Sequence, residues 1–233
     1  MSNLDRILDL VAARRAGRSP YILGVTGAVA AGKSTFAEQL RAALAAGPDA
    51  PSVEIVCTDG FLMNNAALEA LGLINRKGFP ESYDVAAMRA ALAAIRAGPA
   101  DFPGYSHTNY DIDQALTRRL APPDVLIVEG LGLHAGAAAL GLDALIYLDA
   151  EEGQIEAWFT ERFVGLWRAA ETDPASFYAR FRHMNETELR VFAGQVWAAI
   201  NLPNLREHIV LGRDAADIVV TKGADHGILE VKG

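Results

Sequence analysis

The chain has 233 residues, of which 51% are apolar, so a sizeable hydrophobic core is available to one α/β domain. Its formal net charge is −8 and no stretch clusters lysine with arginine, which argues against a nucleic-acid-binding surface. The single cysteine, Cys57, cannot form an internal disulfide, no apolar run is long enough to span a bilayer, and the first residues lack the pattern of a signal peptide. We therefore expect a cytoplasmic protein that binds neither nucleic acid nor membrane.

Hydrophobic periodicity and Gly/Pro breaks divide the chain into alternating helices and strands. The predicted elements are, in chain order, an amphipathic helix within residues 1–17, a strand at 21–26, a helix at 34–46 that stops at Gly47-Pro48, a strand at 53–57, a helix at 85–97 with Asp84 as N-cap and Gly98-Pro99 as its stop, strands at 125–128 and 144–149, helices at about 152–169 and 174–200, and strands near 217–221 and 228–231.

These strands are continuous apolar runs, which predicts a mostly parallel sheet covered by helices on both faces. Residues 1–17 then form an N-terminal helix, and residues 18–233 form one core domain. In sheets of this kind, ligands bind at the carboxyl ends of the strands. Three polar segments, beginning at Gly27, Asp59 and Glu129, follow predicted strands, so we expect them to meet in one crevice.

Residues 27–34 read Gly-Ala-Val-Ala-Ala-Gly-Lys-Ser between a predicted strand and a predicted helix. This pattern is typical of a phosphate-binding loop, whose glycines let backbone N–H groups turn toward the β- and γ-phosphates, while Lys33 adds a positive charge and the Ser34 hydroxyl can ligate Mg²⁺. We predict a nucleoside triphosphate site in a three-layer P-loop NTPase fold; the alternative is a Gly-rich turn that binds no ligand. The predicted nucleotide-binding residues are Gly27, Ala28, Val29, Ala30, Ala31, Gly32, Lys33, Ser34 and Thr35.

Two carboxylates end predicted strands near this loop. Asp59 could ligate Mg²⁺ through water or accept the proton of an attacking hydroxyl, and the alternative is a helix or turn cap. Glu129 holds the Walker-B position, and a carboxylate that ends a buried strand is costly unless it meets a metal or a donor. We predict that Glu129 helps to hold Mg²⁺ or supports the base, with a structural hydrogen bond as the alternative.

An arginine lies within the apolar stripe of the predicted helix at 152–169. Arg162 is three residues from Phe159 and four from Trp158, which places it on the inward face of the helix. A guanidinium in that position should pair with a carboxylate or reach a phosphate. We predict a transition-state or acceptor-binding arginine; the alternative is a structural arginine stacked on an aromatic ring.

Residues 105–111, Tyr-Ser-His-Thr-Asn-Tyr-Asp, crowd hydrogen-bonding groups into a loop bounded by Gly and Pro. Their density favours a pocket for a polar substrate, although His107 taken alone is typical of a surface histidine. The pair Arg118-Arg119 predicts a solvated helix face.

The ordered set of motifs resembles the bacterial type I pantothenate kinases, which are P-loop kinases of the phosphoribulokinase/uridine kinase-like superfamily. The similarity runs from about Tyr21 to the C-terminus, and its most specific motif is Lys-Gly-Phe-Pro-Glu-Ser-Tyr-Asp at 77–84. The other matching segments are Thr58 to Leu62, Tyr105 to Asp111, Glu129 to Leu131, Tyr147 to Ala150, Trp158 to Phe163, Ile200-Asn201 with Asn204-Leu205, and Thr221-Lys222 with His226.

The resemblance implies ATP- and Mg²⁺-dependent phosphorylation of the primary hydroxyl of pantothenate, the first step toward coenzyme A, by a homodimer. It implies that Asp59 is the catalytic base, that Lys33 and Ser34 hold the triphosphate and Mg²⁺, and that Arg162 stabilises the transferring phosphoryl group. The helices at about 152–200 would help to bind the acceptor. The implied acceptor-binding residues are Tyr105, His107, Tyr110, Phe159 and Asn201, and those near the adenine are Lys222 and His226.

Several positions depart from the family pattern. Phe159 stands where the family has a substrate-contacting tyrosine, and Leu166 replaces an aromatic residue of the acceptor pocket. Glu38 replaces a basic residue in the region where coenzyme A phosphates would compete with ATP, so we expect little feedback inhibition by coenzyme A. Residues 210–212 replace a Leu-Pro-Thr turn, and the segment ahead of the phosphate-binding loop is shorter than usual.

A related P-loop kinase for another hydroxyl compound, such as a nucleoside or a sugar, is the first alternative. The loss of a hydroxyl at Phe159 and the short N-terminal segment favour it.

A nucleotide switch without kinase chemistry is the second alternative. Guanine-specific switches carry Asn-Lys-x-Asp or Thr-Lys-x-Asp, and Thr221-Lys222-Gly223-Ala224-Asp225 has one residue too many for that pattern. A switch also has no need of Asp59, Arg162 and the polar loop together.

Overall fold

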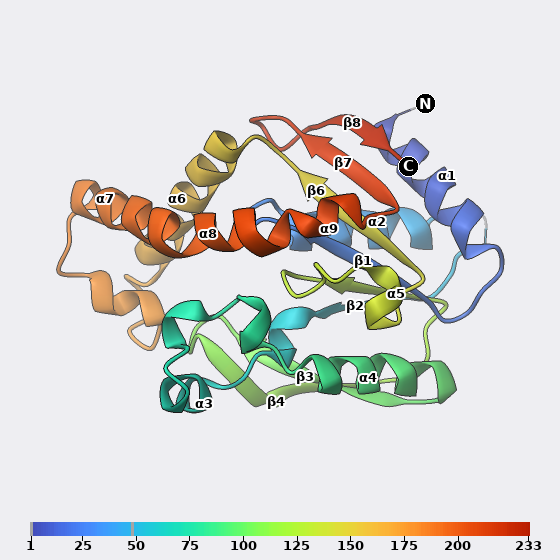
Figure 1. The fold of residues 1–233 in the computed structure, drawn as a ribbon, viewed down its shortest axis with the longest axis horizontal. Helices are drawn as coiled ribbons and strands as arrows, with labels where there is room; N and C mark the ends of the chain where they lie inside the picture. Colours follow the sequence, from blue (N-terminus) through green and yellow to red (C-terminus); the bar gives the residue numbers. More distant parts are fainter. Residues whose placement is uncertain (1, 48) are drawn as a thin grey trace.

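The computed structural model describes residues 2–47 and 49–233, so Pro48 of the predicted helix stop lies outside the described residues. A six-stranded sheet forms the centre, with strand order β2-β5-β1-β6-β7-β8 (Figure 1). All neighbouring strands are parallel except β7 and β8, which confirms the predicted mostly parallel sheet. The strands are β1 (Tyr21–Gly27), β2 (Val53–Cys57), β5 (Val125–Glu129), β6 (Ala144–Asp149), β7 (Ile218–Lys222) and β8 (Ile228–Lys232).

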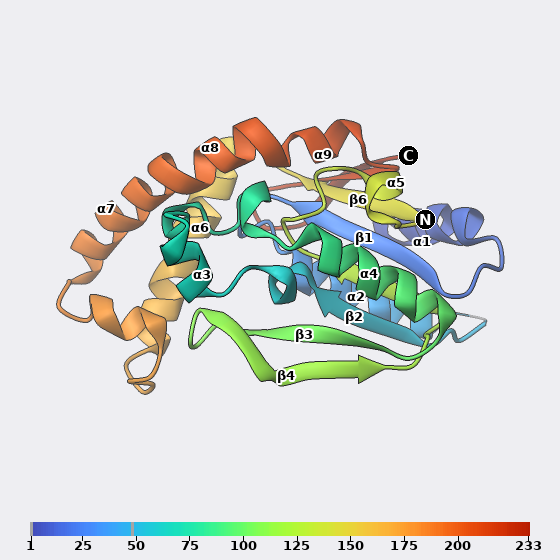
Figure 2. The same cartoon turned by 60° about the horizontal axis from the view of Figure 1, so that its bottom comes forward.

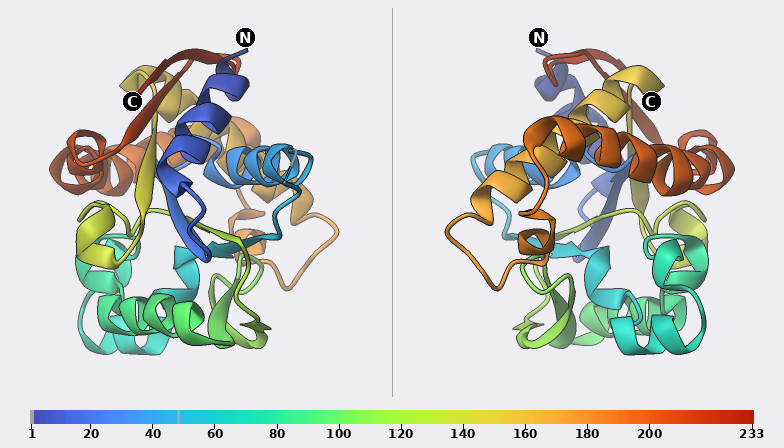
Figure 3. Two further views of the ribbon diagram at one scale, coloured as in Figure 1. Left: turned by 90° about the vertical axis from the view of Figure 1, so that its right-hand side faces the viewer. Right: turned by 90° about the vertical axis from the view of Figure 1, so that its left-hand side faces the viewer.

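Helices cover both faces of this sheet, which confirms the three-layer prediction (Figure 3). Successive β1 side chains point to opposite faces, as the strand geometry requires. Leu23 and Val25 pack in one cluster with α1 (Asn3–Arg15) and α2 (Lys33–Ala45). Ile22 packs in the other cluster, with α4 (Val85–Ala97) and α5 (Ala137–Leu140). Because β1 is buried on both faces, its sequence is a continuous apolar run rather than an alternating one.

Local capping signals set most helix ends where the sequence predicts them. Ser2 and Asp5 form a capping box that starts α1. Asp84 accepts a hydrogen bond from the backbone N–H of Ala87 at 2.8 Å and caps α4, which ends at Gly98. The predicted helix at 152–169 is α6 (Glu152–Ala169).

The single helix predicted at 174–200 is wrong. Residues Phe177–Phe181 form a short 3₁₀ helix, and α7 (Glu186–Val196) begins only after the capping box of Asn185 and Glu188. Beyond it the chain continues as an arch of helical turns over the sheet (Figure 2). The arch consists of a π turn (Trp197–Asn201), α8 (Leu202–Asn204), a second π turn (Leu205–Ile209) and α9 (Leu211–Asp214).

Pro203 accounts for this irregular helix, because proline has no N–H to donate and its ring prevents the regular bonding of the preceding turn. The arch accordingly widens into a π turn just ahead of Pro203, and a second π turn follows it. Such turns are frequent at functional sites. Asn201 ends the first of them.

A two-stranded hairpin of β3 (Ala100–Ser106) and β4 (Asp111–Leu120) lies beside the main sheet and is absent from the sequence prediction. Arg118 and Arg119 lie on β4, so the helix face predicted for them is wrong. They form ion pairs with Glu54 and Asp101 instead. Pro103 and a register shift next to it interrupt β3, which obscures the strand pattern. The polar segment 105–111 forms the tip of this hairpin, next to α3 (Asn65–Ala70).

In the part of the chain that the structure describes, none of the helices combines the length and the apolar character that a membrane crossing requires.

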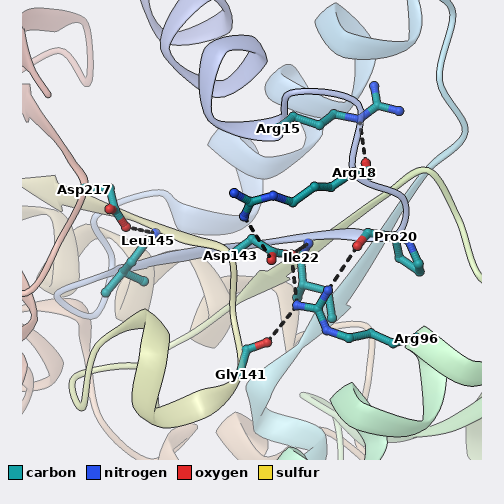
Figure 4. A network of polar contacts seen from close by, with 9 residues as sticks. All are labelled: Arg15, Arg18, Pro20, Ile22, Arg96, Gly141, Asp143, Leu145 and Asp217. Atoms are coloured by element: carbon teal, nitrogen blue, oxygen red, sulfur yellow. Dashed lines mark hydrogen bonds and ion pairs between the residues drawn. The ribbon is translucent and has the colours of Figure 1, made fainter.

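A polar network fastens the sheet at its amino edge, opposite the predicted ligand edge (Figure 4). Asp143 accepts hydrogen bonds from the backbone N–H of Ile22 at 2.7 Å and from Arg96 at 2.9 Å. Arg96 also donates to the carbonyl oxygens of Pro20 and Gly141, so it joins the end of α4 to the starts of β1 and β6.

Replacing Asp143 with alanine should lower the free energy of unfolding by about 2–3 kcal/mol, because it leaves the Ile22 N–H without its acceptor and removes the carboxylate that pairs with Arg96. The Asp143 side chain is only 13% exposed, so water replaces it poorly. Urea unfolding measures the change.

Asp101→Ala is the control, because Asp101 pairs with Arg119 on an exposed surface. That change should lie within about 0.5 kcal/mol of zero. Equal effects of the two substitutions would contradict a structural role for the Asp143 network.

Candidate active site

The loop between β1 and α2 has the backbone geometry of a phosphate cradle. Gly27 has a φ of +141°, and a Cβ placed on it would lie 2.5 Å from the carbonyl oxygen of Leu148. Gly32 has a φ of +81° and is the N-cap of α2. Glycine is needed at these two positions because L side chains rarely adopt such conformations. The helix N-terminus that follows points its free N–H groups into the loop.

Lys33 and Ser34 take up the two predicted positions at the start of α2. The Lys33 ammonium donates to the carbonyl oxygen of Ala28 at 2.8 Å, across the loop. The Ser34 hydroxyl donates to the Glu129 carboxylate at 2.9 Å, and Glu129 is 6% exposed. Burial lowers the pKa of Lys33, while the charges of Glu129 and Asp59 act in the opposite direction. The structure thus brings Lys33, Ser34, Glu129 and Asp59 into one charged cluster.

Asp59 lies between the cradle and a second group of residues. It is partly buried in the 3₁₀ turn Thr58–Phe61 that follows β2. The Tyr83 hydroxyl lies 3.5 Å from its carboxylate, at the limit of a hydrogen bond. Burial raises the pKa of Tyr83, and the charge of Asp59 raises it further. Asp59 is therefore close both to the cradle, where its charge acts on Lys33, and to an aromatic, polar wall that begins at Tyr83.

Tyr105, His107 and Tyr110 from the hairpin tip form part of that wall. The Tyr105 ring lies edge-on to His107, with centroids 5.2 Å apart, and 6.2 Å from Tyr110. Tyr110 stacks on Phe177 at 4.4 Å, so the hairpin tip is held against the 3₁₀ helix before α7. Burial raises the pKa of Tyr110 to about 12, with Tyr178 and Asp59 adding to the rise.

Lys77 also belongs to this wall, although the sequence predicts no site role for it. Its ammonium donates to Asn65 Oδ1 and to the Tyr110 carbonyl oxygen, both at 2.6 Å. It also lies 4.5 Å from the ring centre of Tyr110 and 5.0 Å from that of Tyr105. Burial lowers the pKa of Lys77, and the charges of Asp111 and Asp59 oppose this. Its place in the most specific motif, next to a glycine, was the available signal.

Arg162 lies on α6. Arg162 is exposed, so its expected place on the buried face of the helix is wrong. The buried residues of α6 are Ile155, Phe159, Phe163 and Val164, and Arg162 lies beside them. Its charge nevertheless reaches the site, since it adds to the lowering of the Lys33 pKa that burial causes.

Phe159 is 8% exposed and packs within 6.0 Å of Phe163 and 5.8 Å of Trp197, measured between ring centres. It therefore belongs to the aromatic core between α6 and the arch. Asn201 lies partly buried on the arch four residues after Trp197. Of the predicted acceptor-binding residues, Phe159 and Asn201 thus lie on packed helices, whereas Tyr105 and His107 lie on the hairpin.

Lys222 and His226 lie at the other end of the cradle. The Lys222 ammonium donates to the carbonyl oxygen of Ala31 at 2.9 Å and is close to Gly32. His226 stacks on Trp158, with ring centres 3.9 Å apart. Burial lowers the pKa of both Lys222 and His226, and the charge of Lys222 further lowers that of His226. A stacked pair of aromatic rings next to the loop suits a planar ring such as a nucleobase.

A cavity of about 550 Å³ lies between α2, β2 and the hairpin. Tyr105, His107, Cys57 and Glu38 line it, so it adjoins the aromatic wall. Glu38 pairs with Arg41 at 2.8 Å. Among residues 2–47 and 49–233, no cluster of three or more His, Cys, Asp or Glu side chains could hold a metal ion by itself.

The model of the phosphoribulokinase/uridine kinase family matches residues 22–158, which include the cradle, Asp59 and Glu129. The pantothenate kinase of Sorangium cellulosum is 43% identical over 98% of this chain and 77% of its own length. That of Parvibaculum lavamentivorans is 42% identical over 98% and 74%. The chain therefore belongs to the phosphoribulokinase/uridine kinase family and, within it, to the pantothenate kinases.

Solved structures support the fold. A protein of Silicibacter sp. TM1040, described provisionally as a fructose transport system kinase, superposes with a TM-score of 0.74 at 24% identity, covering 96% of this chain and all of that one. The YGR205w protein superposes with a TM-score of 0.67 at 14% identity, covering 100% of this chain and 98% of that one.

Gly32→Ala should weaken ATP binding at least about tenfold, because the new Cβ strains the loop and approaches the Lys222 ammonium. That Cβ would lie 3.0 Å from Lys222 Nζ. Isothermal titration with ATP measures the effect.

Gly17→Ala is a matched control. Gly17 has a similar φ of +79°, and a Cβ there meets nothing within 4 Å. It should cost about 1–2 kcal/mol of stability and leave ATP affinity unchanged. An unaltered ATP affinity in Gly32→Ala would argue against the cradle.

Proposed function

We propose that this chain transfers the γ-phosphoryl group of ATP to the primary hydroxyl of pantothenate. The observation that carries the proposal is that Asp59 lies close enough to Lys33 of the cradle and to Tyr105 and Tyr110 of the wall for its charge to act on all three. A phosphoryl transfer enzyme needs a base between donor and acceptor, and otherwise mainly positioning and charge. The names of the pantothenate kinases to which the chain is similar support this acceptor.

In the proposed reaction, Asp59 accepts the proton of the acceptor hydroxyl while the hydroxyl oxygen forms a bond to the γ-phosphorus. The bond between that phosphorus and the β–γ bridging oxygen breaks, and ADP leaves. Lys33 and the N-terminus of α2 stabilise the charge of the triphosphate. Arg162, exposed at the edge of the site, is free to contact the transferring group in its charged transition state.

Ser34 and Glu129 are proposed to hold Mg²⁺. A hydroxyl and a buried carboxylate that already lie 2.9 Å apart are the hard oxygen ligands that Mg²⁺ prefers. When bound, Mg²⁺ would neutralise charge on the β- and γ-phosphates. The hydrogen bond from the Ser34 hydroxyl also lessens the cost of burying the Glu129 carboxylate.

For the acceptor, we propose that Tyr105, His107, Tyr110 and Asn201 hydrogen-bond to its polar groups, and that Phe159 packs against its apolar part. Lys77 adds a positive charge on the same side, which suits an anionic acceptor such as pantothenate. At the far end of the cradle, Lys222 and His226 are proposed to lie next to the adenine.

We further propose that the chain acts as a cytoplasmic homodimer, and that residues 18–233 form one kinase domain with the helix at 1–17 packed on it. Little feedback inhibition by coenzyme A is proposed. The Glu38–Arg41 pair leaves no net positive charge on this part of α2 to attract its phosphates.

Incubation of the purified protein with ATP, Mg²⁺ and pantothenate should release ADP in step with phosphopantothenate, and chelation of Mg²⁺ should stop the reaction. A panel that includes nucleosides and sugars tests the alternative acceptors. If the protein does not turn over millimolar pantothenate but does turn over another acceptor, that other compound is the substrate.

Asp59→Ala should lower kcat about 10²-fold or more and leave ATP affinity within about twofold, because a base acts on the acceptor and does not bind the donor. Steady-state kinetics and ATP titration measure the two effects. Asp101→Ala, on the exposed hairpin, serves as the control. A normal kcat in Asp59→Ala would remove Asp59 as the base.

Arg162→Ala should lower kcat roughly 10²-fold with little change in either substrate's ground-state affinity, because its contact forms mainly in the transition state. Arg168→Ala is a matched control, since Arg168 is on the same helix and pairs with Glu186 on the surface. Equal kinetics in the two variants would count against a role for Arg162.

A further inference from the structure

Asn204 on α8 is a buried polar residue that the proposed reaction does not use. It is 4% exposed, and its Nδ2 donates to the carbonyl oxygen of Gly78 at 2.9 Å, 126 residues away in the chain. Its Oδ1 is also buried and has no partner among residues 2–47 and 49–233. The Gly78 carbonyl fixes the orientation of the amide, because the opposite orientation would place two oxygens together. The unpaired Oδ1 therefore costs stability to keep this one contact.

The other side of Gly78 is held as well. Its N–H donates to the Ser82 hydroxyl at 2.9 Å, and Ser82 is fully buried. Gly78 has a φ of +91°, so a side chain at this position would be strained. We call Asn204, Gly78 and Ser82 the Gly78 clamp. The clamp binds both the N–H and the carbonyl oxygen of Gly78, the residue that follows Lys77.

The Gly78 clamp acts on Lys77 through the backbone. Ser82 binds the N–H of the peptide unit that joins Lys77 to Gly78, and Asn204 binds the carbonyl of the next peptide unit. The Lys77 ammonium is held in turn by Asn65 Oδ1 and the Tyr110 carbonyl oxygen. Asn204 also lies three residues after Asn201 on the arch. One side chain thus ties the arch to the Lys77 segment and, through Lys77, to the hairpin tip.

We propose that Asn204 is a positioning residue for the acceptor site. It holds Lys77 and the hairpin tip at a set distance from Asn201. The two sides of the acceptor site, the wall at the hairpin tip and the arch at Asn201, are therefore ordered before the acceptor enters. Without Asn204, acceptor binding must order these two sides, which weakens affinity. This inference rests on the proposed function for the identity of the acceptor, but not for the ordering of residues 76–83.

Asn204→Leu tests the proposal, because leucine has a similar volume and removes the hydrogen bond without burying a charge. The KM for pantothenate should rise about tenfold, while kcat and the KM for ATP stay within about twofold. Asn3→Leu is the matched control: Asn3 Nδ2 also donates to a distant carbonyl, that of Ile228 at 2.7 Å, but on α1. Its KM for pantothenate should equal that of the unaltered protein.

Hydrogen exchange without substrates gives a second readout that does not depend on turnover. Exchange of residues 76–83 should increase in Asn204→Leu and not in Asn3→Leu. Unchanged exchange in this segment overturns the proposal, as does an unchanged KM in an active enzyme. A uniform increase along the whole chain indicates a merely structural residue and overturns it too. If the unaltered protein does not turn over pantothenate, the proposed function fails. The exchange result still shows whether the Gly78 clamp orders residues 76–83.

Ser82→Ala removes the opposite half of the Gly78 clamp and replaces Asn204→Leu if that variant does not fold. The same rise in KM and in local exchange is expected. When both variants fold, their effects should be less than additive in the double variant, because each releases one polar group of the same residue, Gly78. Normal KM and exchange in Ser82→Ala overturn the proposal.

Discussion

The parallel pairing of β1 between β5 and β6 is the constraint on which the rest of the structure depends. It places Val25 opposite Glu129 and Gly27 opposite Leu148, so the ends of three strands meet at one edge. Only in this register does the Glu129 carboxylate reach the Ser34 hydroxyl. A shift by one residue would turn Glu129 to the other face of the sheet and leave it as an unpaired buried charge.

The acceptor side depends on elements outside the sheet. The hairpin tip is fastened to the segment before α7 by a hydrogen bond from the Phe177 N–H to the Thr108 carbonyl oxygen at 2.8 Å and by the stacking of Tyr110 on Phe177. Lys77 then joins the tip to α3 through Asn65. The donor half is thus built on sheet pairing, and the acceptor half on side-chain contacts between distant segments.

How well each part could be predicted follows from this difference. The cradle, Asp59 and Glu129 could be located because strand ends and a fixed loop pattern are local signals. One long helix is predicted at 174–200, but the capping box at Asn185 starts a new helix there, and Pro203 affects the turns beyond it. The irregularity at Pro103 conceals the hairpin in the sequence. Arg162 was expected inside the apolar stripe, but helical spacing alone does not show where the buried face ends. Lys77 and Asn204 stand in recognisable motifs, but the sequence predicts no site role for them because their partners are far away in the chain.

The sequence by itself determined the strand–loop–helix cradle, the alternation of strands and helices, and the family to which the motifs belong, because each depends on residues close together in the chain. The tertiary structure decided which polar groups face Asp59 and which residue holds Gly78. Those contacts join segments up to 126 residues apart, and only the packing of the arch against residues 77–83 brings them within hydrogen-bond distance. The cradle of the donor is therefore a local property of this chain, whereas the acceptor site is a property of the whole fold.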